Sequence, residues 1–276
     1  MFTRIAVTSC IVVWAGLATS ARAADLDQVI YAPDLPMTQP VEIGSGWYLR
    51  GDLGYSVRTR GAATNYSIFT AGPTYTSTPF DSSSLDSDWS GSLGVGYNFT
   101  DYLRADLTFE YTEGTFSGAT SSAFPCGANP VGTGCASIDS QGFKNYGVMA
   151  NAYLDLGTFS GFTPYVGAGA GMTHVTWAGL NSANRCTGVG CVAPVASSAN
   201  PGQDDWRFTY ALMAGVSYDL TKDLKVDLGY KYSKVKDGAQ FGYSAGDVAS
   251  GATGVQASDN GFEKHEVRVG LRYSLW

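Results

Sequence analysis

The last fourteen residues, Glu263 to Trp276, constrain the fold of this chain more than any other segment. They read EKHEVRVGLRYSLW, and from Val267 to Leu275 apolar side chains alternate strictly with polar or small ones. Such alternation places one face of a β-strand in an apolar medium and the other face among polar groups. A strand of this length, with aromatic residues at its end, is typical of a membrane-spanning β-barrel.

The first residues predict a secretory signal peptide over residues 1–23. Arg4 supplies the positive n-region, Ile5 to Leu17 form the apolar stretch, and Ala21-Arg22-Ala23 is an A-x-A cleavage site. The apolar stretch is too short to span a membrane. We therefore expect residues 24–45 to form an extended periplasmic segment and residues 46–276 to form the barrel.

The charge balance excludes some partners. Without Arg4 and Arg22 the chain has 15 Lys and Arg residues against 24 Asp and Glu residues, a formal charge of −9. Because its basic residues are few and scattered, we expect no nucleic-acid partner. No stretch after the signal approaches 18 apolar residues, so no transmembrane helix is expected. The 35 Gly and 17 Tyr residues suit a sheet with tight turns and aromatic girdles.

Alternation recurs in eight segments, and this count predicts the fold. The expected strands are Gly46–Arg58, Asp88–Phe99, Leu103–Tyr111, Phe143–Leu156, Thr163–Thr176, Trp206–Leu220, Leu224–Ser233 and Glu263–Trp276. Short turns near Thr100, Gly157 and Thr221 alternate with long polar loops over residues 59–87, 113–142, 177–205 and 234–261. Outer-membrane barrels have short periplasmic turns and long extracellular loops. The prediction is an all-β, transmembrane, antiparallel eight-stranded β-barrel with four long extracellular loops.

The inward faces of these strands carry charges of both signs. The lumen of an eight-stranded barrel is only wide enough for side chains, and a buried charge must be paired. The predicted lumen charge network comprises Arg50, Asp52, Arg104, Asp106, Glu110, Arg207, Lys225, Asp227, Lys231, Glu266, Arg268 and Arg272, with Arg58 and Lys144 also expected inside. A salt-bridged plug is the favoured interpretation. The alternative is a narrow porin that passes ions or small solutes, for which the inward glycines Gly167, Gly169 and Gly171 leave room.

Four cysteines remain after the signal peptide, and an exported chain meets an oxidising compartment. Three pairings are conceivable. Their spacing favours Cys126–Cys135 and Cys186–Cys191, each closing a small loop that the barrel does not need. A metal site or free thiols are the alternatives, but the segments CGANPVGTGC and CTGVGC lack histidine ligands. We expect two disulfides, no metal and no cofactor.

Two histidines are candidates for catalysis. His174 is predicted at the loop end of its strand, and Asp204 or Asp205 could face it. His265 lies near the start of the last strand. A histidine beside a carboxylate can act in acid–base catalysis, but no serine is placed convincingly near His174. We therefore expect no enzyme and no catalytic residues.

The predicted loops contain aromatic residues among Ser, Thr, Gly and Asn. These residues are Tyr66, Phe69, Tyr75, Phe80, Phe116, Phe124, Phe241 and Tyr243. Packing of the loops on themselves is the favoured interpretation. A surface for lipopolysaccharide, for a host partner or for a ligand such as haem is the alternative.

Four stretches give the chain a resemblance to a known family: ADLDQVIYAP, GWYLRGDLGYS, FTPYVGAGAG and HEVRVGLRY. Over about Ala24 to Trp276, the chain resembles the outer-membrane β-barrel family of small alphaproteobacterial surface proteins. These proteins are relatives of the OmpA barrel. The resemblance implies a Gram-negative outer-membrane location, lipid and lipopolysaccharide contacts, and recognition of the C-terminal strand by the barrel-assembly machinery. It implies a barrel rather than an activity. One departure is Trp276, which lies one step out of phase with the outward residue Leu275.

Overall fold

The computed structural model describes residues 46–275, apart from residues 62, 71, 73, 88, 193, 194 and 196. The predicted signal peptide, the segment up to residue 45 and Trp276 lie outside the described residues. Within the described range, no helix has both the length and the apolar character needed to cross a membrane.

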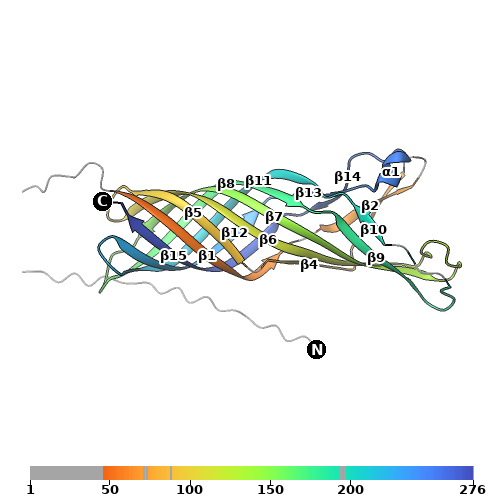
Figure 1. The fold of residues 1–276 in the computed structure, drawn as a ribbon, viewed down its shortest axis with the longest axis horizontal. Coiled ribbons are helices and arrows are strands. Elements are labelled where there is room, and N and C mark those ends of the chain that lie inside the picture. The colour runs from red at the N-terminus through yellow and green to blue at the C-terminus, as the bar shows by residue number, and fades with distance from the viewer. Residues whose placement is uncertain are drawn as a thin grey trace, which may run out of the picture. The chain divides into compact units, whose positions relative to one another are not determined.

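Eight antiparallel strands form a closed ring (Figure 1). In ring order they are β1 (Trp47–Arg60), β5 (Trp89–Asn98), β6 (Leu103–Ser122), β7 (Gly134–Asp155), β8 (Phe162–Trp177), β11 (Asp204–Asp219), β12 (Leu224–Val235) and β15 (Phe262–Ser274). The ring closes where β15 pairs with β1, for example Val269 opposite Leu53. The predicted eight-stranded antiparallel barrel is confirmed.

The two ends of the barrel differ. Short turns join β5 to β6, β7 to β8 and β11 to β12 at one end, which we call the turn end. Thr100 and Thr221 stabilise two of these turns, because each hydroxyl accepts hydrogen bonds from backbone N–H groups two and three residues later. All long connections lie at the opposite end, which we call the loop end.

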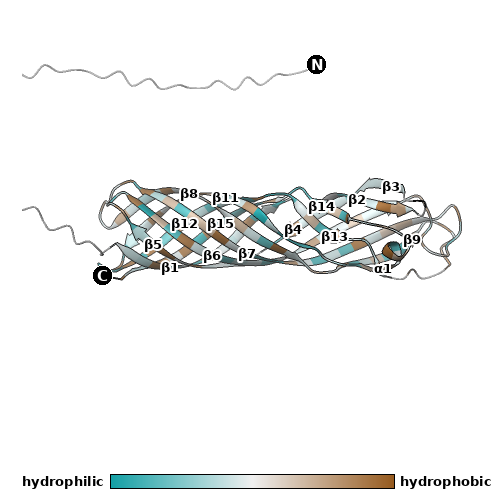
Figure 2. Cartoon of the chain, turned by 90° about the horizontal axis from the view of Figure 1, so that it is seen from above, coloured by the Kyte–Doolittle hydropathy of each residue, from teal (hydrophilic) through white to brown (hydrophobic). Residues whose placement is uncertain are grey.

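The outward face of the ring is apolar and carries aromatic residues near both ends. Leu53, Leu93 and Leu271 are exposed in its middle. Pairs of aromatic rings lie at either side of this belt, such as Tyr55 with Trp89 toward the loop end, and Trp47 with Tyr97 toward the turn end. In Figure 2 apolar and polar residues alternate along the strands of this section. A belt of exposed apolar side chains between two aromatic girdles suits lipid contact.

The barrel wall continues past the belt at the loop end. β6 extends eleven residues beyond Tyr111, roughly 36 Å of strand. The added elements are β2 (Ala63–Thr70), β3 (Thr74–Pro79), β4 (Ser82–Asp86), β9 (Leu180–Thr187), β10 (Ser198–Asn200), β13 (Gly238–Gly242), the short helix α1 (Ala245–Ala249) and β14 (Val255–Asp259). We call this part the loop-end extension. The four predicted loops are therefore connections at the loop end, as expected, but they consist largely of strands.

Two sheets face each other in the loop-end extension. One sheet has the order β13-β14-β2-β3, and the other continues the barrel wall through β4, β6, β7, β9 and β10. Apolar side chains fill the space between them. The buried residues of this core are Leu85, Phe116, Phe143, Val175, Trp177, Leu180, Val235, Phe241, Ala257 and Phe262. The core holds the extension as a folded unit above the barrel.

Two inward charges predicted from the sequence are wrong. The register of β1 against β15 shifts between Ser56 and Arg58, and this bulge leaves Arg58 exposed. Lys144 is also exposed, because it shares the outward phase of Tyr146 on β7. The glycines of β8 do face inward as predicted: a Cβ at Gly169 would meet Asn151, and one at Gly171 would meet the backbone of Val148.

Candidate functional site

Charged side chains fill the lumen inside the apolar belt. Arg50 forms two salt bridges there. Its Nη2 lies 2.7 Å from Asp52 Oδ1, and its Nη1 lies 2.7 Å from Asp106 Oδ2. Nη1 also donates a hydrogen bond to the hydroxyl of Tyr153 at 2.7 Å. Asn151 donates to the second oxygen of Asp106 at 2.8 Å. Each group in this cluster therefore has an opposite charge or a hydrogen-bond partner within reach.

A second cluster lies nearer the loop end. Glu110 is paired with Lys231 and with Arg268, the latter at 3.1 Å. Glu266 accepts contacts from Arg268 at 3.4 Å and from Lys264 at 2.8 Å. Two carboxylates and three cations thus form one connected group across β6, β12 and β15, and Lys231 and Glu266 are almost fully buried.

Arg104 and Arg272 occupy the lumen nearer the turn end. The Nε atom of Arg104 donates to Asp155 at 3.1 Å, and its guanidinium carbon lies 4.0 Å from the ring centre of Tyr153 and 4.9 Å from that of Tyr165. Arg272 lies 3.2 Å from Asp227. The two Nη atoms of Arg104 have no hydrogen-bond partner among the described residues, and the faces of the two tyrosine rings partly compensate for this through cation–π contact.

Two predicted members of the lumen network lie apart from it. Arg207 is buried at the base of the loop-end extension, where it pairs with Asp259 and Asp205, each at 2.6 Å. Lys225 pairs with Asp219 at 2.7 Å beside the β11–β12 turn, with about a third of each side chain exposed. Arg207 thus joins barrel to extension, and Lys225 lies at the mouth of the barrel.

Some members of the network were missed from the sequence. Lys264 is buried and could have been found, because it shares the inward phase of Glu266 on β15. Tyr153, which contacts Arg50 and Arg104, was not among the predicted site residues. Its role depends on the neighbours that the barrel brings to it from β1 and β6.

The packed lumen leaves little free space. A gap of about 20 Å³ remains among residues that include Arg50, Tyr153, Tyr165 and Lys231. That volume holds about one water molecule.

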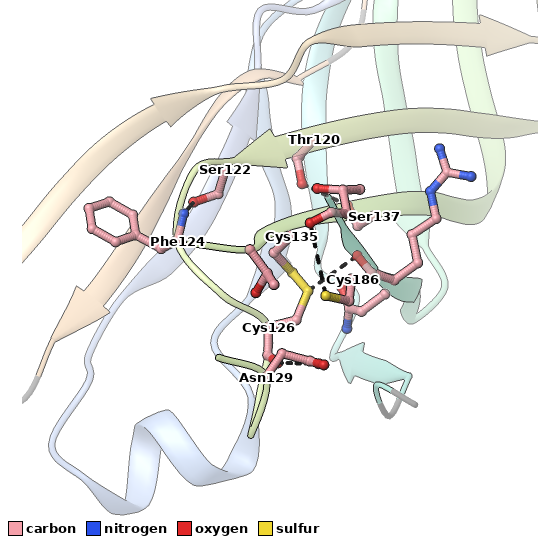
Figure 3. The surroundings of a disulfide bond; sticks show 12 residues. Thr120, Ser122, Phe124, Cys126, Asn129, Cys135, Ser137 and Cys186 are labelled. Carbon is pink, nitrogen blue, oxygen red and sulfur yellow. Dashed lines mark hydrogen bonds between the residues drawn. A yellow bond between two sulfur atoms is a disulfide. The ribbon is translucent and has the colours of Figure 1, made fainter. Parts of the chain in front are cut away.

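The four cysteines lie together at the far tip of the loop-end extension. Disulfides join Cys126 to Cys135 and Cys186 to Cys191, the pairing expected from the sequence. Cys135 and Cys186 are directly opposite in the register of β7 and β9, and Figure 3 shows Cys186 beside the Cys126–Cys135 bond. The backbone N–H of Val192 donates to the side chain of Asn129, which ties the two disulfide-closed loops together.

The tip exposes large apolar side chains. The exposed fractions are 79% for Phe124, 96% for Val131, 99% for Val189 and 75% for Val192. We call these four residues the tip surface. The segments that carry them, residues 120–137 and 186–203, contain no charged residue.

The other loop aromatics are divided between core and surface. Phe116 and Phe241 belong to the core of the loop-end extension, and Tyr66 and Phe80 pack against it. Phe69 and Tyr75 contact each other and Tyr243, which is buried. Every predicted loop aromatic except Phe124 therefore packs on another part of the loops, as the favoured interpretation of the sequence has it, and Tyr75 does so at a partly exposed position.

The histidines lie on the outer face of the wall. His174 Nε2 is 3.2 Å from Asp204 Oδ2, and its ring packs on Trp206. His265 contacts Tyr230 and Tyr232. Asp204 is therefore the carboxylate that faces His174, but the nearby hydroxyl is that of Thr176, a hydrogen-bond partner on the ring's other nitrogen. Among the described residues, no group of three or more potential ligands is arranged to hold a metal.

Comparison with known proteins places this architecture in a family. The chain is 40% identical to an uncharacterised protein of Brucella suis biovar 1, over 98% of each chain. It is 25% identical to a protein of Rickettsia prowazekii named as a candidate adhesin, over 84% of this chain and 89% of the other. A solved structure, Neisserial surface protein A, aligns with a TM-score of 0.44 at 16% identity, covering 84% of this chain and 98% of that one.

The family match covers most of the chain. Residues 37–274 match the outer membrane protein beta-barrel domain. That range contains all eight strands of the ring, with the apolar belt and the aromatic girdles described above. The chain therefore belongs to the outer-membrane β-barrel family, and its location is the outer membrane of a Gram-negative cell.

Proposed function

We propose that this protein is a surface-exposed barrel whose lumen serves as a closed scaffold and whose loop-end extension binds a partner. The observation that carries the proposal is the tip surface. Phe124, Val131, Val189 and Val192 are at least three-quarters exposed on loops that two disulfides and the β7–β9 ladder hold in place. Large apolar side chains that stay exposed on ordered loops favour a contact role for this tip.

Preorganisation supports this reading of the tip. A loop that is already ordered loses little conformational entropy when it binds. The loops that carry the tip surface also lack charged residues, so burying these loops against a partner would not remove water from an ion on them. The candidate adhesins of Rickettsia, which match most of this chain, are in keeping with a surface-recognition role.

The alternative of a small porin has less support. The charged side chains of the lumen are paired with one another, and Tyr153 contacts both Arg50 and Arg104. An ion would have to displace these contacts to pass. The space beside the inward glycines is occupied by the side chains of Asn151, Tyr153 and Met149, so the glycines do not open a channel there.

The test is binding of the reconstituted protein to cell monolayers. Fluorescent nanodiscs carrying the wild-type protein should bind epithelial cells, and the variant F124S/V131S/V189S/V192S should lose most of this binding. The variant V248S/V255S is the matched control, because these valines are also exposed on the loop-end extension but lie outside the tip. Equal binding by wild type and the tip variant would contradict the proposal.

A further inference from the structure

Between the two sheets of the loop-end extension lies a pocket of about 170 Å³ that the tip surface does not include. Its floor is the apolar core, represented by Leu180, Phe241 and Phe80. Above this floor the inward residues change from apolar to polar: on β9, for example, Leu180 is followed inward by Ser182 and Asn184.

One buried carboxylate in this pocket lacks the partners that the lumen carboxylates have. Asp139 is 3% exposed, and its Oδ2 accepts a hydrogen bond from Ser137 at 2.8 Å. Among the described residues Asp139 forms no ion pair, and its Oδ1, which is not one of the fully enclosed unpartnered atoms, accepts no side-chain hydrogen bond. This oxygen is therefore free to accept a hydrogen bond from a group that enters the pocket, and a charged acceptor forms stronger hydrogen bonds than a neutral one.

The remaining polar groups around the pocket are neutral and both donate and accept. Thr120 and Ser137 are joined through their hydroxyls at 2.7 Å. Across the pocket, the amide of Asn200 on β10 donates to Gln256 Oε1 on β14 at 2.6 Å, which links the two sheets. Asp139 is the only charged residue among those that line the pocket.

Aromatic rings provide an apolar wall beside these groups. Tyr66 and Phe80 pack with ring centres 5.1 Å apart, and both line the pocket together with Phe241. We propose that this pocket binds one neutral sugar ring. Its hydroxyls would donate to Asp139 and exchange hydrogen bonds with the hydroxyls and amides, while its C–H face would lie on the aromatic wall.

Size and charge narrow the ligand class. The pocket is smaller than the 300 to 1,000 Å³ typical of drug-sized ligands, so it suits a single ring, such as a terminal residue of a glycan. A lone carboxylate with no lining Lys or Arg disfavours sulfated or uronic acid sugars. A simple amine would engage Asp139 but would leave the neutral amides and hydroxyls unmatched. Such a small site predicts a dissociation constant in roughly the millimolar range.

The experiment is ligand-observed NMR on the full-length protein in lipid nanodiscs, since detergents with sugar headgroups would compete. The probes are neutral monosaccharides, glucuronic acid, a sulfated monosaccharide and ethanolamine. At least one neutral sugar should bind, and the charged probes should bind more weakly. Asp139→Asn should weaken binding about tenfold, because a charge-assisted acceptor is lost. Asp101→Asn, on an exposed turn at the turn end, is the matched control and should bind as wild type does.

A second variant tests sugar binding independently if Asp139→Asn fails to fold. Ser182→Val removes a lining hydroxyl and narrows the pocket, and it should also weaken binding while the heat-modifiable gel band remains. The proposal is overturned if no neutral sugar binds to the folded wild type, if both variants bind as wild type does, or if a charged probe binds best.

The same chemistry could come from a host glycan or from bacterial polysaccharide. The sugar that binds best is therefore tested in two arms, as glycoprotein oligosaccharides and as oligosaccharides released from lipopolysaccharide. The arm with stronger binding identifies the source, and failure of both arms would overturn a glycan ligand. The tip-surface proposal is independent, because the F124S/V131S/V189S/V192S variant leaves the pocket unchanged and should keep sugar binding.

Discussion

Cys135 of β7 and Cys186 of β9 are directly opposite each other in the antiparallel register, although each is bonded to a different cysteine. The two disulfides are therefore neighbours at the tip, and the pairing of β7 with β9 joins them into one compact unit. Opposite Cβ atoms in an antiparallel pair are about 4.5–5.5 Å apart, so an approach of roughly 1 Å would bring them to the 3.5–4.5 Å found across a disulfide.

This register predicts a new bond when the outer cysteines are removed. In the variant C126S/C191S, Cys135 and Cys186 should form a cross-strand disulfide in the oxidising periplasm, which peptide mass spectrometry without reduction would detect. Two free thiols in that variant would contradict the register. The variant with all four cysteines changed to serine is the control, and it should still insert and show the folded gel band because both disulfides lie beyond the barrel.

Arg50 is the cation on which two lumen carboxylates depend. Arg50→Leu leaves Asp52 and Asp106 buried without their main partner, and should lower the free energy of unfolding by about 3–5 kcal/mol. The triple variant R50L/D52N/D106N should recover most of this loss. The urea concentration at which the heat-modifiable band disappears measures both. Lys225→Gln, at the partly exposed mouth, should change that midpoint little.

Two glycines with opposite orientation test the packing of the barrel interior. A Cβ at Gly171 would lie 2.0 Å from the carbonyl oxygen of Val148, whereas a Cβ at Gly91 would meet nothing within 4 Å. Gly171→Ala should therefore reduce the yield of folded barrel, and Gly91→Ala should not. Refolding efficiency on a gel compares the two. Equal yields would show that β7 and β8 are not packed as closely as described.

Phe116 and Phe124 lie on or next to the same strand but in opposite environments. Phe116 is fully buried in the core of the loop-end extension, and Phe124 is 79% exposed at the tip. Phe116→Ala should cost the extension about 3–5 kcal/mol and make it sensitive to limited proteolysis, while the barrel band persists. Phe124→Ala should leave protease resistance unchanged. Similar cleavage of both variants would contradict a folded core in the extension.

The sequence predicted the barrel well because lipid contact demands strict alternation. Segments such as Val267 to Leu275 must present an apolar residue at every second position. Beyond the belt the outward face meets water, so β6 continues there with Thr115, Ser117 and Ala119, and the strand pattern fades. The loop-end extension is therefore predicted from the sequence as loops, although the packing of its aromatic residues on one another is expected.

The site residues also fall into those that alternation predicts and those that it does not. Lumen charges in phase with the alternation, such as Asp106 and Glu266, are buried where the pattern placed them. Arg58 could not be placed, because a bulge is a local backbone event that alternation does not encode. The pocket around Asp139 was missed for another reason: it joins residues from β2, β7, β9 and β14, and only the three-dimensional pairing brings them together.

Planar-bilayer conductance of the refolded protein tests most directly whether the lumen is a scaffold or a pore. The paired charges and the ring of Tyr153 between Arg50 and Arg104 predict silence even at high protein load. A folded band on the gel from the same sample ensures that silence reflects a closed barrel. Reproducible single-channel steps that disappear in Arg104 or Asp106 variants would contradict the account and favour the porin.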